Sequence, residues 1–301
     1  MTTIIDRGHL LTEQANPRTS ALHTLSPAEL VAVIQAEDRA IAEALAVAAP
    51  VLAGFIAAVA PGFRRGGRLV YVGAGTSGRL GVLDASEAPP TFCVGPDRSI
   101  GLIAGGDGAL RRSSEGAEDD PAGALPALRA LALTADDAVL GIAAGGTTPY
   151  ARGALSAVKH ADSPPITGLL TCAPVAAPPG CDHLIVVPTG PEVLTGSTRM
   201  KAGTATKQAL NTISTSLMVL SGRVHGNLMI EVKATNAKLQ DRAVRIVTAL
   251  TGLNRSAALA VLESAGWSAK TAVVMHRLGH DRPGAEAALA AVGGRLDALL
   301  P

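Results

Sequence analysis

Aromatic residues are scarce in this chain, whose 301 residues include one Trp, two Tyr and three Phe. So few rings make both a base-stacking surface for nucleic acid and an aromatic platform for sugar rings implausible. Neither sign of charge is in excess, since 26 Lys and Arg face 25 Asp and Glu. A near-neutral chain has no global field that would concentrate it on nucleic acid or an anionic membrane. We therefore expect a small ligand held by local polar groups, and no nucleic-acid partner.

Cysteine is also rare. Cys93, Cys172 and Cys181 form no CxxC pair and leave an odd one over, which argues against a disulfide framework and a thiolate zinc site. The first residues, with Asp6 and Arg7 and no apolar core before position 20, do not resemble a secretory signal. The sequence predicts reduced cysteines in a cytoplasmic protein.

One uncharged run, residues 44–63, has the length of a membrane span. Its composition differs from one, because it is rich in alanine and contains Pro50, Gly54 and Pro61. Its larger apolar side chains recur at helical spacing, as one buried stripe would: Leu52, Phe55, Ile56, Val59 and Phe63. We predict a packed helix and no membrane partner.

The sequence has no pattern typical of a metalloprotease or a serine hydrolase. His276 and His280 lie four residues apart, but Gly279 weakens the helix and no carboxylate completes a zinc-protease motif. A GxSxG elbow is missing as well. We expect no metal site.

Hydrophobic periodicity predicts an α/β fold. Ser26, Pro27 and Glu29 have the pattern of a helix start, and a helical layer follows to about residue 62. Short β-rich runs then alternate with helical patterns, at residues 69–72, 100–104, 138–143, 166–170 and 184–187. Such alternation indicates βαβ units around a buried parallel sheet, with ligands expected at the carboxyl ends of its strands.

The chain after the last strand is predicted to be helical. Helical patterns cover residues 198–220 and 227–250, and the last fifty residues predict a small helical bundle.

Three loops rich in glycine and hydroxyl residues, at 73–79, 145–149 and 195–201, are candidate ligand sites. The first satisfies GxGxxG, yet the acidic residue that a dinucleotide-binding fold needs about 20 residues later is missing. Thr76 and Ser77 can instead join backbone N–H groups in holding a single phosphate. A sugar phosphate is therefore favoured over a dinucleotide, with a simple tight turn as the alternative interpretation.

The third loop contains two basic residues, Arg199 and Lys201, besides its hydroxyl residues. An Arg side chain can bind a phosphate through two hydrogen bonds. Arg79, on the first loop, is either a ligand cation or a surface charge. The predicted phosphate-binding and substrate-binding residues are Gly75, Thr76, Ser77, Arg79, Thr147, Thr148, Ser197, Thr198, Arg199 and Lys201.

Two carboxylates are candidates for acid–base chemistry. Pro89 should end the helix after the first loop, which would place Glu87 at the negative end of the helix dipole and favour the protonated form of a general acid. Glu118 has acidic neighbours that favour proton uptake, as a base requires. The residues alone leave a solvated acidic surface as the preferred interpretation of Glu118.

Four longer blocks carry a resemblance to a known family: VGAGTSGRLGVLDASEAPP at 72–90, EGAED at 115–119, EVLTGSTRMKAGTATK at 192–207 and GNLMIEVKATNAK at 226–238. With them the chain resembles the N-acetylmuramic acid 6-phosphate etherases, sugar isomerase (SIS) domain proteins of peptidoglycan recycling, over nearly its whole length. The resemblance implies a flavodoxin-like αβα sandwich and a homodimer with sites near the subunit interface. It also implies an N-terminal helical segment at 1–60, a SIS domain at 61–240 and a three-helix C-terminal domain at 241–301.

The resemblance implies a reaction as well, which cleaves the ether between D-lactate and carbon 3 of the sugar. In the open-chain sugar the C1 aldehyde acidifies the C2 proton, so one carboxylate removes it while another protonates the departing lactate oxygen, and water then adds at C3. Because the aldehyde takes up the electrons, no cofactor is expected. The resemblance assigns Glu87 as the proton donor to lactate and Glu118 as the base at C2.

The second loop departs from the family, which usually has Ser-Gly-Arg-Thr-Pro where this chain has Gly145-Gly146-Thr147-Thr148-Pro149. We expect Thr147 or Thr148 and backbone N–H groups to substitute. Two other interpretations are a noncatalytic sugar-phosphate regulator, similar to glucokinase regulatory proteins, and an aldose–ketose isomerase on the same fold. The pair of carboxylates and the Asp-Ala-Ser-Glu block favour the etherase.

Overall fold

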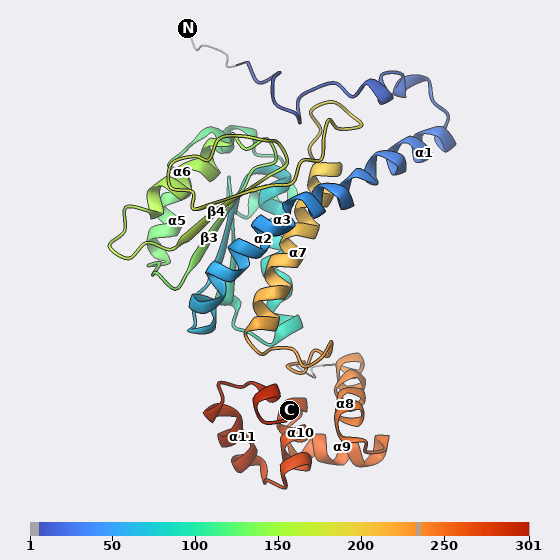
Figure 1. Cartoon of the computed structure of the whole chain (residues 1–301), viewed down its shortest axis with the longest axis vertical. Coiled ribbons are helices and arrows are strands. Elements are labelled where there is room, and N and C mark those ends of the chain that lie inside the picture. The colour runs from blue at the N-terminus through green and yellow to red at the C-terminus, as the bar shows by residue number, and fades with distance from the viewer. Residues whose placement is uncertain (1–5, 233, 235, 301) are drawn as a thin grey trace. The chain divides into compact units, whose positions relative to one another are not determined.

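The structure is a computed structural model that describes residues 6–232, 234 and 236–300, with the side chain of Glu115 left out. Its centre is a sheet of five parallel strands in the order β2-β1-β3-β4-β5, which is the flavodoxin-like order. The strands are β1 Leu69–Gly73, β2 Ser99–Ile103, β3 Ala138–Ile142, β4 Ile166–Thr171 and β5 His183–Val186. Each lies within one residue of its predicted position, so the predicted sandwich is confirmed (Figure 1).

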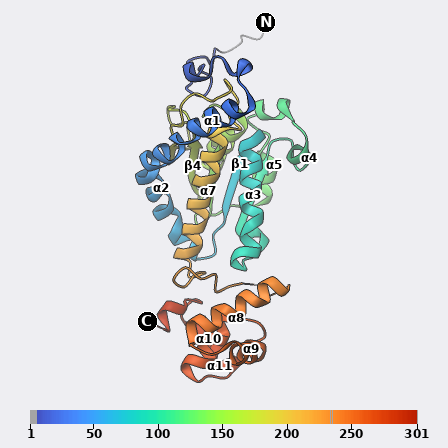
Figure 2. The same ribbon diagram turned by 90° about the vertical axis from the view of Figure 1, so that its right-hand side faces the viewer.

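Alternate residues of the strands face two helical layers. Val70, Val72 and Val139 face α6 (Pro149–Val158) and α5 (Leu125–Ala130). The other face carries α2 (Ala40–Arg64), α3 (Gly75–Phe92) and α7 (Lys201–Leu220), with α7 between the other two (Figure 2). Contact there is close: a Cβ on Gly168 of β4 would stand 2.9 Å from the ring of Phe55 of α2.

The N-terminal helical layer is present as predicted. Ser26 and Glu29 form a capping box at the start of α1 (Pro27–Asp38), in which each side chain binds the backbone N–H of the other. The segment Pro27–Arg64 is long and apolar enough to cross a membrane, judged by length and composition alone. Ten residues of α2 are buried, including the predicted stripe, and α2 packs on β5 and β4. The apolar stripe is accounted for by this packing.

Helix α3 does not end where proline predicts. It runs through Pro89 and Pro90 to Phe92, and the N–H of Cys93 still donates to the carbonyl of Pro89 at 3.0 Å. Packing overrides the local preference, because Ala88 and Phe92 in these last turns are buried. Glu87 therefore lies inside the helix, and the prediction that it sits at the C-terminal end of the dipole is wrong.

The helical prediction for residues 227–250 is half wrong. Helix α8 spans Ala237–Thr251 and begins only after Asn236, whose side chain accepts a hydrogen bond from the N–H of Leu239 at 3.0 Å. Before it, His225 and Leu228 form an isolated bridge around Gly226, whose φ is +56°. This left-handed turn, which glycine tolerates, breaks the helical pattern that the side chains of 227–236 suggest.

The remaining helices after α8 are α9 (Arg255–Ser264), α10 (Ala269–Leu278) and α11 (Arg282–Ala291). With α8 they enclose a core of their own, made from Val244, Val247, Leu262, Val273 and Leu289 among others. Shorter elements elsewhere are η1 (Pro17–Thr19), η2 (Leu22–Thr24), η3 (Pro96–Arg98), α4 (Gly108–Arg111), η4 (Glu115–Asp119) and η5 (Leu296–Ala298).

The chain divides into two compact units. One contains residues 1–86 and 97–213, and the other contains residues 87–96 and 214–301. The expected domain boundaries at residues 60 and 240 stay predictions. Both positions fall inside helices, α2 and α8.

Phe55 is expected to be essential for the contact between α2 and the sheet, since it is fully buried over Gly168. We predict that Phe55→Ala lowers the free energy of unfolding by about 3–5 kcal/mol, because it removes a buried ring and leaves a cavity. Urea unfolding would measure this. Val47→Ala on the same helix is the control, since Val47 is 67% exposed and its loss should change stability by less than about 0.5 kcal/mol. Equal effects of the two substitutions would contradict the packing described.

Candidate active site

The candidate site begins at the topological switch point of the sheet. Strands β1 and β3 are neighbours in the sheet. After β1 the chain continues to β2 on one side, and after β3 it continues to β4 on the other side. Ligands of open α/β sheets bind outside the carboxyl ends of strands at such a point. The first loop follows β1 and the second follows β3, so both border this place.

The glycines of the first loop have structural roles. A Cβ on Gly78 would stand 2.6 Å from the carbonyl oxygen of Gly73, and Gly75 has a φ of +53°. Thr76 and Ser77 follow in the first turn of α3, half-buried, and within the described part of the chain their hydroxyl groups make no hydrogen bond. The loop thus needs its glycines for the turn, and it presents two hydroxyl groups beside the unpaired N–H groups of a helix start.

Arg79 is half-buried and anchors a neighbouring segment. Its guanidinium donates to the backbone carbonyls of Leu110, at 3.3 Å, and Arg112, at 3.5 Å. These bonds tie α3 to the chain that follows β2. The predicted role of Arg79 as a ligand cation stays a prediction.

The second loop contains a glycine that no other residue can replace without strain. Gly146 has a φ of +72°, and a Cβ there would stand 2.7 Å from a methyl carbon of Val175. Thr147 and Thr148 follow, half-buried, at the start of α6. A Cβ on Gly145 would be 3.4 Å from the hydroxyl oxygen of Thr12. A side chain at position 145 would therefore contact the N-terminal segment.

Thr12 was not foreseen from the sequence. It is fully buried, and among the described residues its hydroxyl group has no hydrogen-bond partner. Nothing in the polar N-terminal sequence signals this position, because its contact with the second loop joins residues more than 130 positions apart in the chain.

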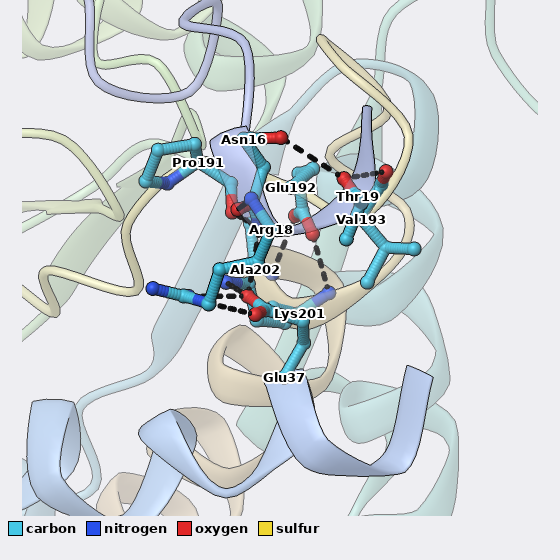
Figure 3. Close-up of polar contacts among 9 residues, drawn as sticks. All are labelled: Asn16, Arg18, Thr19, Glu37, Pro191, Glu192, Val193, Lys201 and Ala202. Carbon is cyan, nitrogen blue, oxygen red and sulfur yellow. Dashed lines mark hydrogen bonds and ion pairs between the residues drawn. The ribbon is translucent and has the colours of Figure 1, made fainter. Parts of the chain in front are cut away.

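The third loop ends at a helix start that a carboxylate of the protein already occupies. Glu192, fully buried, accepts hydrogen bonds from the N–H groups of Lys201 at 3.0 Å and Ala202 at 2.9 Å (Figure 3). Burial raises the pKa of Glu192, while these N–H donors act in the opposite direction. The first N–H groups of α7 are therefore partly used before any ligand arrives.

The two cations of the third loop differ in exposure. Arg199 is exposed, whereas the side chain of Lys201 is only 1% exposed. The Lys201 Nζ donates to the carboxylate of Glu37, in the last turn of α1, at 2.8 Å. Lys201 was predicted to bind phosphate, and in this structure its ammonium group faces the protein interior.

Glu37 is the centre of a polar cluster that the sequence did not indicate. Besides Lys201, its carboxylate accepts from Asn16 Nδ2 at 2.8 Å and from two nitrogens of Arg18, at 2.5 and 2.8 Å (Figure 3). Arg18 is the main reason that the pKa of Glu37 is lowered to about 2, against the effect of burial. Lys201, Asn16 and Arg18 each donate to this carboxylate, so Glu37 has its partners within the protein.

The helix that carries Glu87 is fixed by a buried carboxylate three residues earlier. Asp84 accepts from the hydroxyl group of Tyr71 at 2.7 Å and from Lys207 Nζ at 3.1 Å. These contacts join α3 to β1 and α7. Glu87 itself is exposed, which leaves it accessible to a substrate or to another chain.

Glu118 lies in η4, which packs against α6. Its side chain is half-buried. The chain just beyond it is held tightly to the first half of α6: a Cβ on Gly153 would stand 2.0 Å from the carbonyl oxygen of Pro121. Ala117 and Asp120, close to Glu118 in the chain, line one cavity with Gly105 and Gly106, which follow β2, so η4 lies at the carboxyl end of the sheet, as the second loop does. Glu87 and Glu118 belong to different units, and their meeting at one site stays a prediction.

Comparisons with known proteins identify the family. A family model described as the glucokinase regulatory protein N-terminal SIS domain matches residues 30–159. The N-acetylmuramic acid 6-phosphate etherase of Gloeobacter violaceus is 51% identical over 98% of this chain and 96% of that relative. The corresponding etherase of a Synechococcus species is 53% identical over 91% of this chain and 86% of that relative. The chain belongs to the N-acetylmuramic acid 6-phosphate etherase family.

A solved structure with a similar chain course is the phosphoheptose isomerase of Neisseria gonorrhoeae. It aligns with 65% of this chain and 98% of its own at a TM-score of 0.46 and 19% identity.

In this etherase family member, the Glu37 cluster should make stability depend on acid pH. The pKa of Glu37 is lowered from 4.5 to about 2, so its ionised form stabilises the fold above pH 4.5. This contribution declines as the pH falls from 4.5 through 2. We predict that wild type is more stable than Glu37→Gln by about 3 kcal/mol at pH 6, and that the gap shrinks by about 2 kcal/mol at pH 3. Urea unfolding at both pH values measures it, and a constant gap would contradict it.

Proposed function

We propose that this protein is a carbon–oxygen lyase that cleaves the D-lactyl ether of N-acetylmuramic acid 6-phosphate. The products are N-acetylglucosamine 6-phosphate and D-lactate. The reaction is a step of amino-sugar catabolism during peptidoglycan recycling. The observation that carries the proposal is about 50% identity to etherases of that name over nearly the whole chain.

The proposed reaction is an elimination followed by a hydration. In the open-chain sugar, Glu118 takes the C2 proton, and the electron pair moves into the C1 aldehyde as an enolate. The pair then returns to form the C2–C3 double bond as the C3–O bond breaks, and Glu87 protonates the lactate oxygen. Water adds its hydroxyl group to C3 and a proton returns to C2. The net change is that the ether and one water molecule give N-acetylglucosamine 6-phosphate, with a free hydroxyl group at C3, and D-lactate.

We assign the phosphate to the first two loops, at the carboxyl ends of β1 and β3. Gly75, Thr76 and Ser77 offer N–H and hydroxyl groups at the start of α3, a helix of 18 residues. Thr147 and Thr148 add hydroxyl groups from the second loop. The third loop contributes Ser197, Thr198 and the exposed cation of Arg199.

The geometry of α3 bears on which subunit supplies Glu87. Glu87 is twelve residues beyond Gly75 on this helix, which is about 18 Å at 1.5 Å per residue. That is farther than a hexose 6-phosphate reaches from its phosphate to its C3 oxygen. This separation favours the Glu87 of another copy over the Glu87 of the same α3. We propose a homodimer in which each site combines the loops and Glu118 of one subunit with Glu87 of its partner.

We also place the protein in the cytoplasm. Its three cysteines are free thiols, as expected in a reducing compartment.

Replacing either carboxylate should remove activity without unfolding the protein. We predict that Glu87→Gln and Glu118→Gln each slow lactate release by at least about 100-fold, because a general acid or base is lost. The assay is enzymatic detection of D-lactate, with ¹⁸O-labelled water to follow incorporation at C3. Glu286→Gln, an exposed carboxylate of α11, is the control and should retain wild-type rates.

The same assay separates the enzyme from a noncatalytic regulator, since a regulator would bind the sugar phosphate and release no lactate. Wild-type protein that binds the substrate without releasing lactate would contradict the proposed function.

Mixing the two inactive variants tests the shared site. In a dimer of Glu87→Gln with Glu118→Gln, one of the two sites combines an intact Glu118 with the partner's intact Glu87. Random pairing makes half of the dimers mixed, so we predict that co-refolded or co-expressed variants recover about a quarter of wild-type activity. If both carboxylates came from one subunit, every site would lack one of them and the mixture would stay inactive.

A further inference from the structure

We propose that Lys201 is a positioning residue that holds the third loop and not a ligand of the phosphate. It acts together with Glu37 by fixing the N-terminal segment, residues 10–19, against the loops of the site. The inference rests on the proposed function, because it assigns a role within the same substrate site.

The first observation is the burial of the ion pair. The side chains of Lys201 and Glu37 are 1% and 4% exposed, and their charged atoms lie 2.8 Å apart. Moving the ammonium group to a ligand would leave a buried carboxylate without this partner, which is strongly unfavourable. Arg199, two residues earlier, is exposed and lies on the same loop. Arg199 is therefore the cation of this loop that is available to an anion.

The second observation is how the N-terminal segment binds the start of the third loop. Asn16 Nδ2 donates to the carbonyl of Pro191 at 3.4 Å, and the hydroxyl group of Thr19 donates to the carbonyl of Val193 at 2.8 Å (Figure 3). Both side chains are buried. The residue between these carbonyls, Glu192, binds the first N–H groups of α7.

Glu37 connects the two ends of the loop. Its carboxylate binds Asn16 of the segment that holds the loop start, and Lys201 at the loop end. Arg18, whose side chain is 66% exposed, also binds this carboxylate. Asn16 and Arg18 therefore join the N-terminal segment to Glu37, and the Glu37–Lys201 pair joins α1 to α7.

The segment also lies against both loops at other points. The carboxylate of Glu13 is 3.1 Å from where a Cβ on Gly196 would stand, and the hydroxyl group of Thr12 is 3.4 Å from the same position on Gly145. A loop that must present Ser197 and Thr198 to a ligand gains from being held before the ligand binds. Loss of the ion pair should thus weaken substrate binding more than it slows the chemical steps.

The test is a double-mutant cycle of Glu37→Gln and Lys201→Met, with kcat and KM measured for N-acetylmuramic acid 6-phosphate. We expect each single change to raise KM about tenfold, with kcat within about threefold of wild type. The KM of the double variant should be no higher than the higher of the two single-variant KM values. This pattern means that the two residues act as one unit. If Lys201→Met raises KM and Glu37→Gln does not, Lys201 is a phosphate ligand and the inference is wrong.

Two comparisons keep the test decisive. Arg65→Ala breaks an exposed ion pair with Asp136 in the same unit, and it should leave both kinetic constants unchanged. Hydrogen exchange of amides in residues 190–203 should be faster in Glu37→Gln and Lys201→Met than in wild type, with the strands unchanged. Unchanged exchange in this segment overturns the inference. If one single variant does not fold, the double variant, which leaves neither of these two charges without its partner, supplies the exchange measurement.

Exchange also separates this inference from the proposed function. A wild-type protein that releases no lactate refutes the etherase assignment, while the exchange result still decides whether Glu37 and Lys201 hold the loop.

Discussion

Two buried carboxylates beside the start of α7 hold the third loop in place at the carboxyl end of the sheet. A carboxylate inside a protein must be hydrogen-bonded or paired with a cation, because burial without a partner costs several kcal/mol. Glu192 satisfies this requirement with backbone N–H groups of α7, and Glu37 does so with Lys201, Asn16 and Arg18. The N-terminal segment, α1 and the third loop are held together as a consequence.

Because of these pairings, the loops differ in how many N–H and hydroxyl groups remain free to bind a ligand. The start of α7 already binds Glu192, so its N–H groups are partly used. The start of α3 has no such carboxylate among the described residues, and its hydroxyl groups are not bonded to the protein. An anion is therefore favoured at α3, where the helix dipole and unpaired N–H groups are available. This difference is the physical basis for assigning the phosphate mainly to the first two loops.

The sequence predicted the elements better than their ends. All five strands were found from short runs of β-branched and apolar residues, because a buried parallel sheet demands such runs. The helix through Pro89 and the start of the helix near residue 236 were mispredicted, since packing of Ala88 and Phe92 and the turn at Gly226 outweigh local preferences. In the site, Thr12, Glu37 and Glu192 were missed. Their partners lie far away in the sequence, where no local pattern reports a contact.

The sequence by itself determined the strand and helix pattern, the loops that border the switch point, and the family, because hydrophobic period and long residue blocks are local properties of the chain. Only the tertiary structure decided which cation of the third loop faces solvent and which faces Glu37. It also decided that Glu87 lies inside a helix, about 18 Å along it from the first loop. Burial and pairing depend on segments that meet only after folding, and a side chain's chemistry is settled by those neighbours.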